Sequence, residues 1–87
     1  MAVYKVLLKS SASREIESLP TKEIRRRVVD RINALASNPR PPGCEKLAAQ
    51  HDRYRVRQGR YRIVYEVLDR EVLVVVVRVA DRKDVYR

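Results

Sequence analysis

Residues 53–66 alternate between bulky apolar and charged side chains, and this pattern limits the fold more than any other part of the sequence. The run reads Arg-Tyr-Arg-Val-Arg-Gln-Gly-Arg-Tyr-Arg-Ile-Val-Tyr-Glu. Such a period of two is typical of strands that bury one face. Gln58 and Gly59 interrupt it, and a glycine in the second place of a two-residue loop favours a type I′ turn. The sequence therefore predicts a β-hairpin around this loop.

Counting outward from that loop predicts which residues face each other. Arg57 would lie opposite Arg60, and Arg55 opposite Arg62. The core face would carry Tyr54, Val56, Tyr61, Ile63 and Tyr65. Like charges directly across a strand pair are destabilising, so the arginines have two interpretations. They form either a solvated face whose stems cover their neighbours or a preformed polyanion site, because arginine binds phosphate through two parallel hydrogen bonds.

The chain is small and strongly basic. Its 87 residues suit one domain with a modest core, and its 45% apolar residues argue against disorder. Twenty Lys and Arg against eleven Asp and Glu give a formal charge of +9. This excess favours an anionic partner, which leaves nucleic acid, an anionic membrane surface or an acidic protein.

Neither a metal nor a cofactor is predicted. One cysteine, Cys44, and one histidine, His51, are too few for a zinc site built from these ligands. A lone cysteine and the absence of a signal peptide make the cytoplasm the simplest location, and no apolar run reaches the ~20 residues of a membrane span. Cys44 is expected to be a small buried hydrophobe. His51 titrates near neutrality, but a plain surface histidine is favoured over a general base.

The first half of the chain predicts a strand and two helices. Residues 3–9 are rich in β-formers, and residues 12–19 form a short helix that stops at Pro20. Thr21 caps a longer helix with an apolar stripe at Ile24, Val28, Ile32 and Leu35. Four arginines lie largely off this stripe, and they form either a solvated helix face or a docking surface for nucleic acid or an acidic partner. They are Arg25, Arg26, Arg27 and Arg31.

The second half adds the hairpin and one more strand. Residues 38–43 contain three prolines and form a stiff connection, and residues 45–49 are either a short extended piece or one helical turn. The hairpin's second strand continues to about Leu68, and a turn at Asp69-Arg70 leads into the apolar run 72–77. That run is expected to be a central strand covered on both faces. The order β-α-α-β-β-β predicts one α+β domain over residues 1–87, with two N-terminal helices on an antiparallel four-stranded sheet.

The last residues, 81–87, read Asp-Arg-Lys-Asp-Val-Tyr-Arg. A charged tail normally frays, but the preceding strand delivers this one to the sheet that carries the hairpin arginines. Its tyrosine could also stack on a base. Together with Tyr54-Arg55-Val56-Arg57, Gly59 and Tyr61-Arg62-Ile63-Val64-Tyr65, this ending resembles the RelE toxins of toxin–antitoxin systems, and the resemblance covers essentially the whole chain.

The resemblance implies a RelE-like fold and a ribosome-dependent endoribonuclease that cuts messenger RNA in the A site. The 2′-hydroxyl attacks the adjacent phosphorus, without a metal, and fixed guanidinium groups stabilise the developing charge. It implies catalytic roles for Arg62 at the scissile phosphate, Arg82 at the transition state or leaving group, and Tyr86 on the substrate base. Arg57 falls where many members carry a lysine proposed as the base, yet arginine stays protonated, so Arg57 acts electrostatically or the base lies elsewhere. Further phosphate contacts are expected from Arg53, Arg55, Arg60 and Lys83.

The same resemblance implies partners and leaves two alternatives. A cognate RelB-like antitoxin, the ribosome with its 16S rRNA, and mRNA are the expected partners, with no membrane. One alternative is a ParE-like toxin that inhibits gyrase without chemistry of its own. The other is a non-catalytic RNA- or ribosome-binding module that uses the same basic face for phosphate contact alone.

Overall fold

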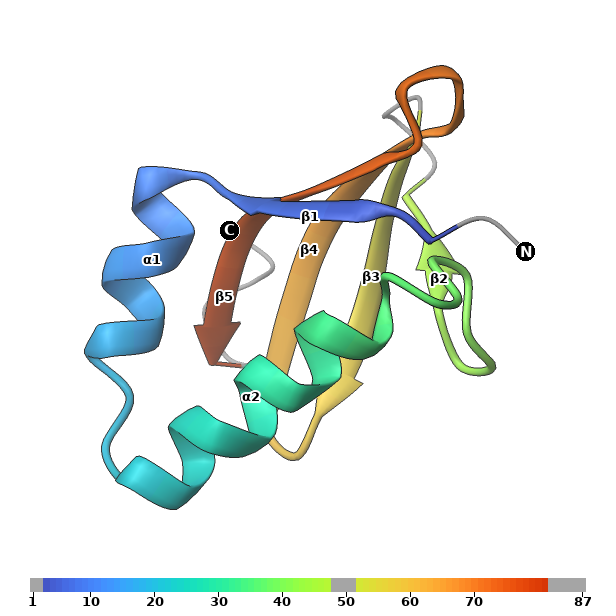
Figure 1. Cartoon of the computed structure of the whole chain (residues 1–87). Coiled ribbons are helices and arrows are strands. Elements are labelled where there is room, and N and C mark those ends of the chain that lie inside the picture. Colours follow the sequence, from blue (N-terminus) through green and yellow to red (C-terminus); the bar gives the residue numbers. More distant parts are fainter. Residues whose placement is uncertain (1–2, 48–51, 82–87) are drawn as a thin grey trace.

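The computed structural model describes residues 3–47 and 52–81, which form two helices packed on one sheet (Figure 1). Strand β1 and helices α1 and α2 come first, and four strands and a 3₁₀ turn follow. The bounds are β1 Lys5–Leu8, α1 Ser10–Glu17, α2 Lys22–Ala34, β2 Glu45–Lys46, β3 Arg53–Gln58, β4 Tyr61–Leu68, η1 Asp69–Glu71 and β5 Leu73–Asp81. The prediction of an α+β domain with two N-terminal helices is confirmed.

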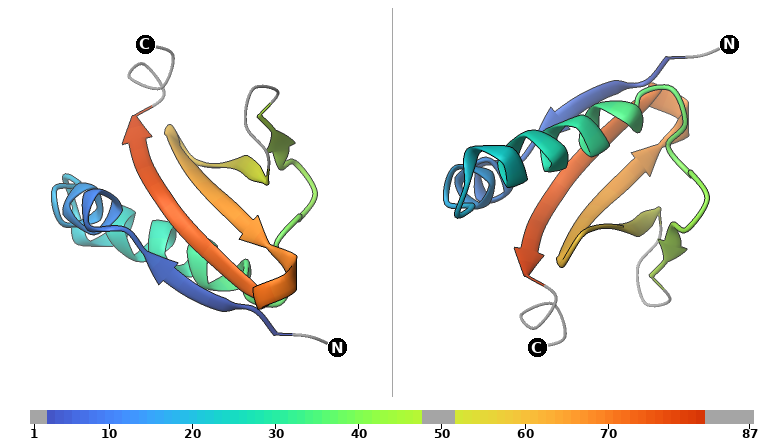
Figure 2. Two further views of the ribbon diagram at one scale, coloured as in Figure 1. Left: turned by 90° about the horizontal axis from the view of Figure 1, so that it is seen from above. Right: turned by 90° about the horizontal axis from the view of Figure 1, so that it is seen from below.

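The expected antiparallel four-stranded sheet is wrong in two respects. The sheet has five strands in the order β1-β5-β4-β3-β2, and β1 runs parallel to β5. The chain leaves β1 through the two helices, enters the sheet again at the opposite edge as β2, and returns through antiparallel β3, β4 and β5, so the last strand comes to lie beside β1 and parallel to it. The undecided segment after the prolines supplies the short edge strand β2, which pairs antiparallel with β3. Figure 2 shows β1 and β2 at opposite edges of the twisted sheet.

The predicted cap and apolar stripe of α2 are confirmed. Thr21 Oγ1 accepts a hydrogen bond from the backbone N–H of Ile24 at 3.1 Å, which satisfies one free donor of α2. The stripe residues Val28, Ile32 and Leu35 are buried and Ile24 is half-buried. The shorter helix α1 begins at Ser10, two residues before the expected start, and ends before Pro20.

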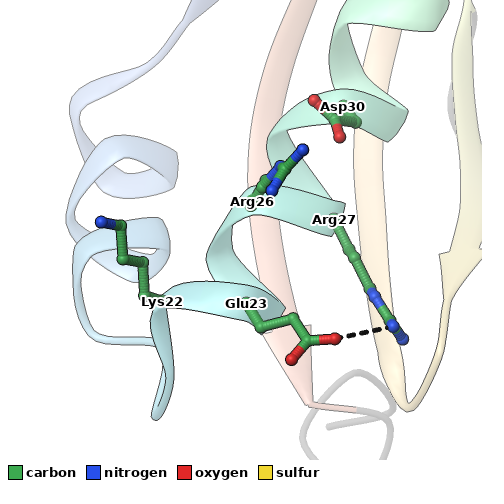
Figure 3. A pocket seen from close by; sticks show the side chains of 5 residues that line it. All are labelled: Lys22, Glu23, Arg26, Arg27 and Asp30. Carbon is green, nitrogen blue, oxygen red and sulfur yellow. Dashed lines mark hydrogen bonds and ion pairs between the residues drawn. The ribbon is translucent and has the colours of Figure 1, made fainter.

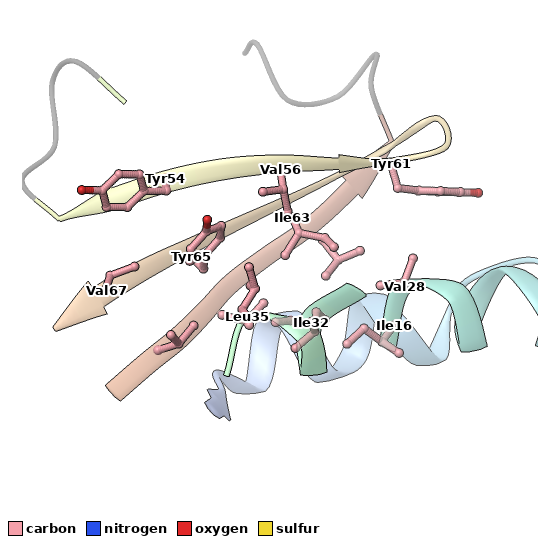
Figure 4. Packing of buried hydrophobic residues seen from close by; sticks show 14 of the residues in the cluster. Ile16, Val28, Ile32, Leu35, Tyr54, Val56, Tyr61, Ile63, Tyr65 and Val67 are labelled. Carbon is pink, nitrogen blue, oxygen red and sulfur yellow. The ribbon is translucent and has the colours of Figure 1, made fainter. Parts of the chain in front are cut away.

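One face of the sheet carries the core, here called the tyrosine face (Figure 4). It consists of the inward side chains of β3 and β4 that pack on α2, namely Tyr54, Val56, Tyr61, Ile63, Tyr65 and Val67. Tyr54 and Tyr65 stack with their ring centroids 6.0 Å apart. The Tyr65 hydroxyl donates to the Pro39 carbonyl at 2.7 Å, and burial in this core is the main reason its pKa is raised. The predicted core face is therefore confirmed.

The predicted hairpin register is wrong by one step at the turn. Gln58 belongs to β3 and pairs with Tyr61, so Gly59 and Arg60 form the loop. Gly59 has φ +61 while Arg60 keeps a negative φ, which is the pattern of a type II′ turn with glycine in its first place. Arg57 consequently pairs with Arg62 and Arg55 with Val64. Because the pairing shifts by two residues, the strand residues keep their faces, but Arg60 moves into the turn and only one pair of arginines is directly opposed.

Strand β5 lies between β1 and β4, but its apolar run is fully covered on one face only. Val74 and Val76 are buried, while Leu73, Val75 and Val77 on the other face are half-buried. The expectation of cover on both faces is thus wrong, since both helices contribute to the core on one side.

A β-bulge at Val77 resets which residues of β5 face inward. Val64 pairs with Arg78, whereas Tyr65 pairs with Val76, so Val77 is the extra residue. Without it, the alternation would direct Arg78 into the core; with it, Val79 is buried and Arg78 is exposed. The bulge therefore keeps a cation out of the core.

Helix α1 covers the edge of β5 beyond the end of β1. The Ser11 hydroxyl donates to the Val77 carbonyl at 3.0 Å, and Glu15 Oε1 accepts from the Val79 N–H at 2.7 Å. The other Glu15 oxygen accepts from Arg78 at 3.0 Å. Since an open strand edge invites pairing with another chain, these contacts close part of it.

The proline-rich connection is fastened to the sheet by Arg40. Its Nη2 donates to Asp69 Oδ2 at 2.7 Å, its Nε donates to the Tyr54 hydroxyl at 3.0 Å, and its guanidinium lies 5.1 Å from the centre of the Tyr54 ring. The Tyr4 hydroxyl donates to Asp69 Oδ1 at 2.7 Å. The bonds from Arg40 and then Tyr4 lower the pKa of Asp69. Here this group is called the Arg40 clasp.

Candidate functional site

The face of the sheet opposite the tyrosine face carries the hairpin arginines, and it is here called the arginine face. Alternation along β3 and β4 directs Arg55, Arg57 and Arg62 away from the core. Neighbouring strands align these side chains in rows across the sheet, and the rows differ in charge. The chemistry of this face is therefore best described row by row.

Two of the rows contain their own carboxylates. In the first, Arg53 of β3 faces Glu66 of β4, and Arg53 Nη2 lies 2.7 Å from Glu66 Oε2. In the second, Glu45 of β2 faces Arg55, and Arg55 Nη2 lies 2.8 Å from Glu45 Oε1. That row continues through Val64 to Arg78, which meets Glu15. These arginines are at least partly neutralised.

The row nearest the turn contains no acidic residue. It consists of Arg57, Arg62 and Ala80 on β3, β4 and β5. Arg62 is only 4% exposed, and Arg57 is exposed and makes no ion pair with any residue in ranges 3–47 and 52–81. Opposing two cations and burying one of them is costly. Such a departure from local rules is expected where function requires it.

Arg60 belongs to the turn and not to a strand of this face. Its Nη2 lies 3.0 Å from Asp81 Oδ2, at the end of β5. A hollow of about 30 Å³ lies between the turn and the row, lined by Arg57, Gly59, Arg60, Tyr61 and Arg62. That volume holds about one water molecule, so a phosphate could place an oxygen there but could not be enclosed.

Several predicted site residues lie outside the described part of the chain. Arg82, Lys83 and Tyr86 are not among the described residues, so their predicted roles stay predictions, and the same holds for His51, which was expected to be a surface histidine. The structure brings Arg57, Arg60 and Arg62 together around one hollow. It sets Arg53 and Arg55 in rows with carboxylates. Cys44, expected to be buried, is half-buried against the core.

Sequence reasoning missed the carboxylates of this surface, which are Glu15, Glu45, Glu66 and Asp81. Glu66 could have been found, since it ends the alternating stretch and the correct register places it opposite Arg53. Glu45 could not, because nothing in residues 45–49 predicts a strand beside β3. Its pKa is lowered, first by the hydrogen bond from Arg55 and also by the charges of Arg57 and Arg62.

The basic side of α2 forms a second, different surface (Figure 3). An open hollow of about 590 Å³ there is lined by Lys22, Glu23, Arg26, Arg27 and Asp30. Arg27 Nη2 lies 2.8 Å from Glu23 Oε1 in an exposed pair one helical turn apart. Acidic and basic groups are mixed here, which is typical of a solvated helix face. The arginine face is the stronger candidate.

Within residues 3–47 and 52–81, no group of three His, Cys, Asp or Glu side chains is placed to hold a metal ion. None of the helices in the same ranges is long and apolar enough to cross a membrane.

The chain matches a protein family over nearly its whole length. The sequence model of the family described as "ParE toxin of type II toxin-antitoxin system, parDE" matches residues 6–86. A search of curated proteins gave no match.

Solved structures with this fold include RelE toxins and their complexes. A chain of the toxin–antitoxin complex RelBE2 from Mycobacterium tuberculosis is 29% identical, with 97% of each chain covered and a TM-score of 0.80. The archaeal RelE–RelB complex from Pyrococcus horikoshii gives 26% identity, coverage of 94% of this chain and 98% of the other, and a TM-score of 0.82. An arginine-to-alanine double variant of E. coli RelE, bound to an antitoxin peptide, is 30% identical. The match covers 99% of this chain and 92% of the other, with a TM-score of 0.75.

The sequence match and the structural matches agree on one superfamily although they carry different names. The sequence model is a ParE model, whereas the similar structures are RelE complexes. A shared fold does not by itself fix the target of a toxin. Because the family model spans residues 6–86, the chain belongs to the ParE toxin family of type II toxin–antitoxin systems, within the RelE/ParE superfamily.

Proposed function

We propose that this toxin is a RelE-type, ribosome-dependent endoribonuclease that cuts messenger RNA in the ribosomal A site and stops translation. The observation that carries the proposal is the row of Arg57 and Arg62, two opposed arginines with no acidic residue between the strands. Both guanidinium groups can donate to an anion that lies over this row. A phosphodiester in the transition state would benefit from both guanidinium groups.

In the proposed reaction, Tyr86 or a group of the ribosome takes the proton of the ribose 2′-hydroxyl, and the 2′-oxygen bonds to the adjacent phosphorus. The bond from phosphorus to the 5′-oxygen breaks and the 5′-oxygen takes up a proton from water, so the products carry a cyclic phosphate and a 5′-hydroxyl. Negative charge grows on the non-bridging oxygens, where Arg57 and Arg62 would stabilise it. Neither is the base, since arginine remains protonated. In this proposal Arg82 supports the leaving group and Tyr86 orients the base.

The direct test adds purified toxin to programmed ribosomes and maps the 5′ ends of the message by primer extension. Arg57→Ala is the informative variant, because Arg57 is exposed and its loss should not unfold the domain. Removing one donor to the transition state typically lowers a rate by about 10²–10³-fold. Arg26→Ala is the matched control, since it removes an exposed arginine from α2 on the other side of the sheet.

Cuts confined to the A site, lost with Arg57→Ala and kept with Arg26→Ala, are the expected result. Message that stays intact while the toxin binds ribosomes would contradict catalysis and favour a non-catalytic RNA-binding module. Equal losses in both variants would mean that overall charge, and not this row, matters.

A second candidate is inhibition of DNA gyrase, and the ParE sequence model favours it. Gyrase inhibition would need a protein-docking surface and no chemistry. A supercoiling assay with purified gyrase separates the two functions. Inhibition of supercoiling, with translation of a reporter message unaffected, would replace the nuclease proposal.

The proposal includes a cognate RelB-like antitoxin and a cytoplasmic location. Similar toxins have been solved in complex with RelB or as RelBE assemblies. An acidic or amphipathic antitoxin would complement a toxin with charge +9. Co-expression of a neighbouring acidic open reading frame should relieve toxicity and yield a complex that stays intact on purification.

A further inference from the structure

Glu45 is the carboxylate of the arginine face that stands one row from Arg57 and Arg62. It lies on β2, directly across from Arg55, and Arg55 precedes Arg57 by two positions on the same face of β3. Glu66, by comparison, faces Arg53 two positions farther away. The field of Arg57 and Arg62 reaches Glu45, because both charges lower its pKa.

The two partners of the Glu45–Arg55 pair differ in exposure. The Arg55 side chain is 13% exposed, whereas that of Glu45 is 58% exposed. The guanidinium is therefore held by the sheet, and the carboxylate covers it from the solvent side. The bond of 2.8 Å occupies a donor that a phosphate oxygen could also accept.

We propose that Glu45 is an internal competitor of RNA phosphate, which occupies Arg55 in the RNA-free toxin and is displaced when RNA binds. This inference rests on the proposed function only in taking RNA as the polyanion. Glu45 would therefore lower the affinity of the arginine face for the phosphates of any single strand. It acts through Arg55 and is a positioning residue, because it need not contact the substrate.

The test compares Glu45→Gln with Glu23→Gln, using a short fluorescent oligouridylate over a series of salt concentrations. Glu23 is a matched control, since it is also exposed and also lies 2.8 Å from an arginine, but on α2. Both variants gain the same net charge. Glu45→Gln should bind several-fold more tightly than Glu23→Gln, and its plot of log K against log salt should steepen by about 0.7, the value for one more phosphate contact.

Two further variants separate a role in binding from a role in folding. Glu45→Asp keeps the charge and should bind like the wild type. In the background of Arg55→Ala, Glu45→Gln should add less affinity than it does alone. Thermal melting of Glu45→Gln should change little, because the charge that is removed is on the partner that is 58% exposed, and exposed charges contribute little to stability.

Equal affinities for Glu45→Gln and Glu23→Gln would overturn the inference, since net charge alone would then explain any gain. Weaker binding by Glu45→Gln would overturn it too, because Glu45 would then orient Arg55 for RNA. These results are independent of cleavage. A gain in affinity without A-site cuts would support the inference while the nuclease proposal failed, and cuts without a specific gain would do the reverse.

Discussion

Strands β3 and β4 present two faces built from the same alternating sequence, and the two faces follow opposite rules. The tyrosine face packs Ile63, Tyr65 and Val67 against α2 with no exposed surface on any of them. The arginine face opposes Arg57 to Arg62 and sets the other arginines beside carboxylates. One face therefore stabilises the domain, and the other keeps charge in a fixed arrangement at some cost in stability.

The comparison also shows that burial alone does not identify core residues. Arg62 is 4% exposed, less than Tyr54 or Tyr61 on the tyrosine face. The two faces differ in the type of side chain and in which side chains the strand pairing sets opposite each other. The following substitutions test that difference.

The largest effect is expected from truncating adjacent residues of β4 on opposite faces. Ile63→Ala should cost about 2–5 kcal/mol of unfolding free energy, because it opens a cavity at a fully buried site. Val64→Ala, on the half-buried arginine face, should cost below about 1 kcal/mol. Urea unfolding of both variants measures the difference. Equal losses would mean that the arginine face is also a packed core.

Arg62→Lys should show the reverse, a loss of function with little loss of stability. Lysine keeps the charge but lacks the planar fork of arginine, so A-site cleavage should fall by about 10²-fold or more. Unfolding free energy should fall by less than for Ile63→Ala, because lysine keeps a long charged side chain at this buried position and opens a smaller cavity. Primer extension and urea unfolding provide the two values. A variant that is clearly less stable but keeps its specific activity would mean that Arg62 serves the fold and not the reaction.

Tyr65→Phe tests the one buried hydroxyl of the tyrosine face that reaches a backbone carbonyl. Removing it leaves the Pro39 carbonyl without this donor, which should cost about 1–3 kcal/mol. Tyr61→Phe is a useful control, because no hydrogen bond of its hydroxyl is found in the described residues. If both variants melt alike, the Tyr65 bond contributes nothing measurable.

The smallest effect concerns pH and the Arg40 clasp. Hydrogen bonds from Arg40 and Tyr4 lower the pKa of Asp69 in the folded state. Its contribution is therefore present above the unfolded pKa of about 3.9 and disappears as pH falls through the folded value. Melting temperature should decline more steeply for the wild type than for Asp69→Asn below about pH 4. Parallel curves would show that Asp69 adds nothing to acid sensitivity.

Much of the local structure could be predicted from the sequence, because local signals decide it. Thr21 caps α2 as a threonine before an apolar stripe should, and the alternation of residues 53–66 assigns the strand residues of the hairpin to the correct face, although Arg60 lies in the turn. The turn failed because Gln58-Gly59 and Gly59-Arg60 both form acceptable two-residue loops with glycine in different places. Only pairing across the sheet decides between them.

Features that depend on pairing between distant strands could not be predicted from the local sequence. The parallel pairing of β1 with β5 joins residues about seventy positions apart, such as Lys5 and Leu73. The strand character of Glu45 depends on β3 lying beside it. The arginines of the candidate site were named from the sequence, but which rows also contain a carboxylate depends on Glu45 of β2 and Glu66 of β4.

The pairing of β1 with β5 also bears on how this toxin is made. β1 precedes its parallel partner Leu73–Val76 by about seventy residues, so it is synthesised well before the strand with which it pairs. Closing so long a loop is slow and gives no stability until both ends meet. We expect a nascent chain stopped before residue 73 to show no cooperative unfolding and no toxicity. The β3–β4 hairpin that carries the arginine face is therefore made before the domain that holds it in place can be completed.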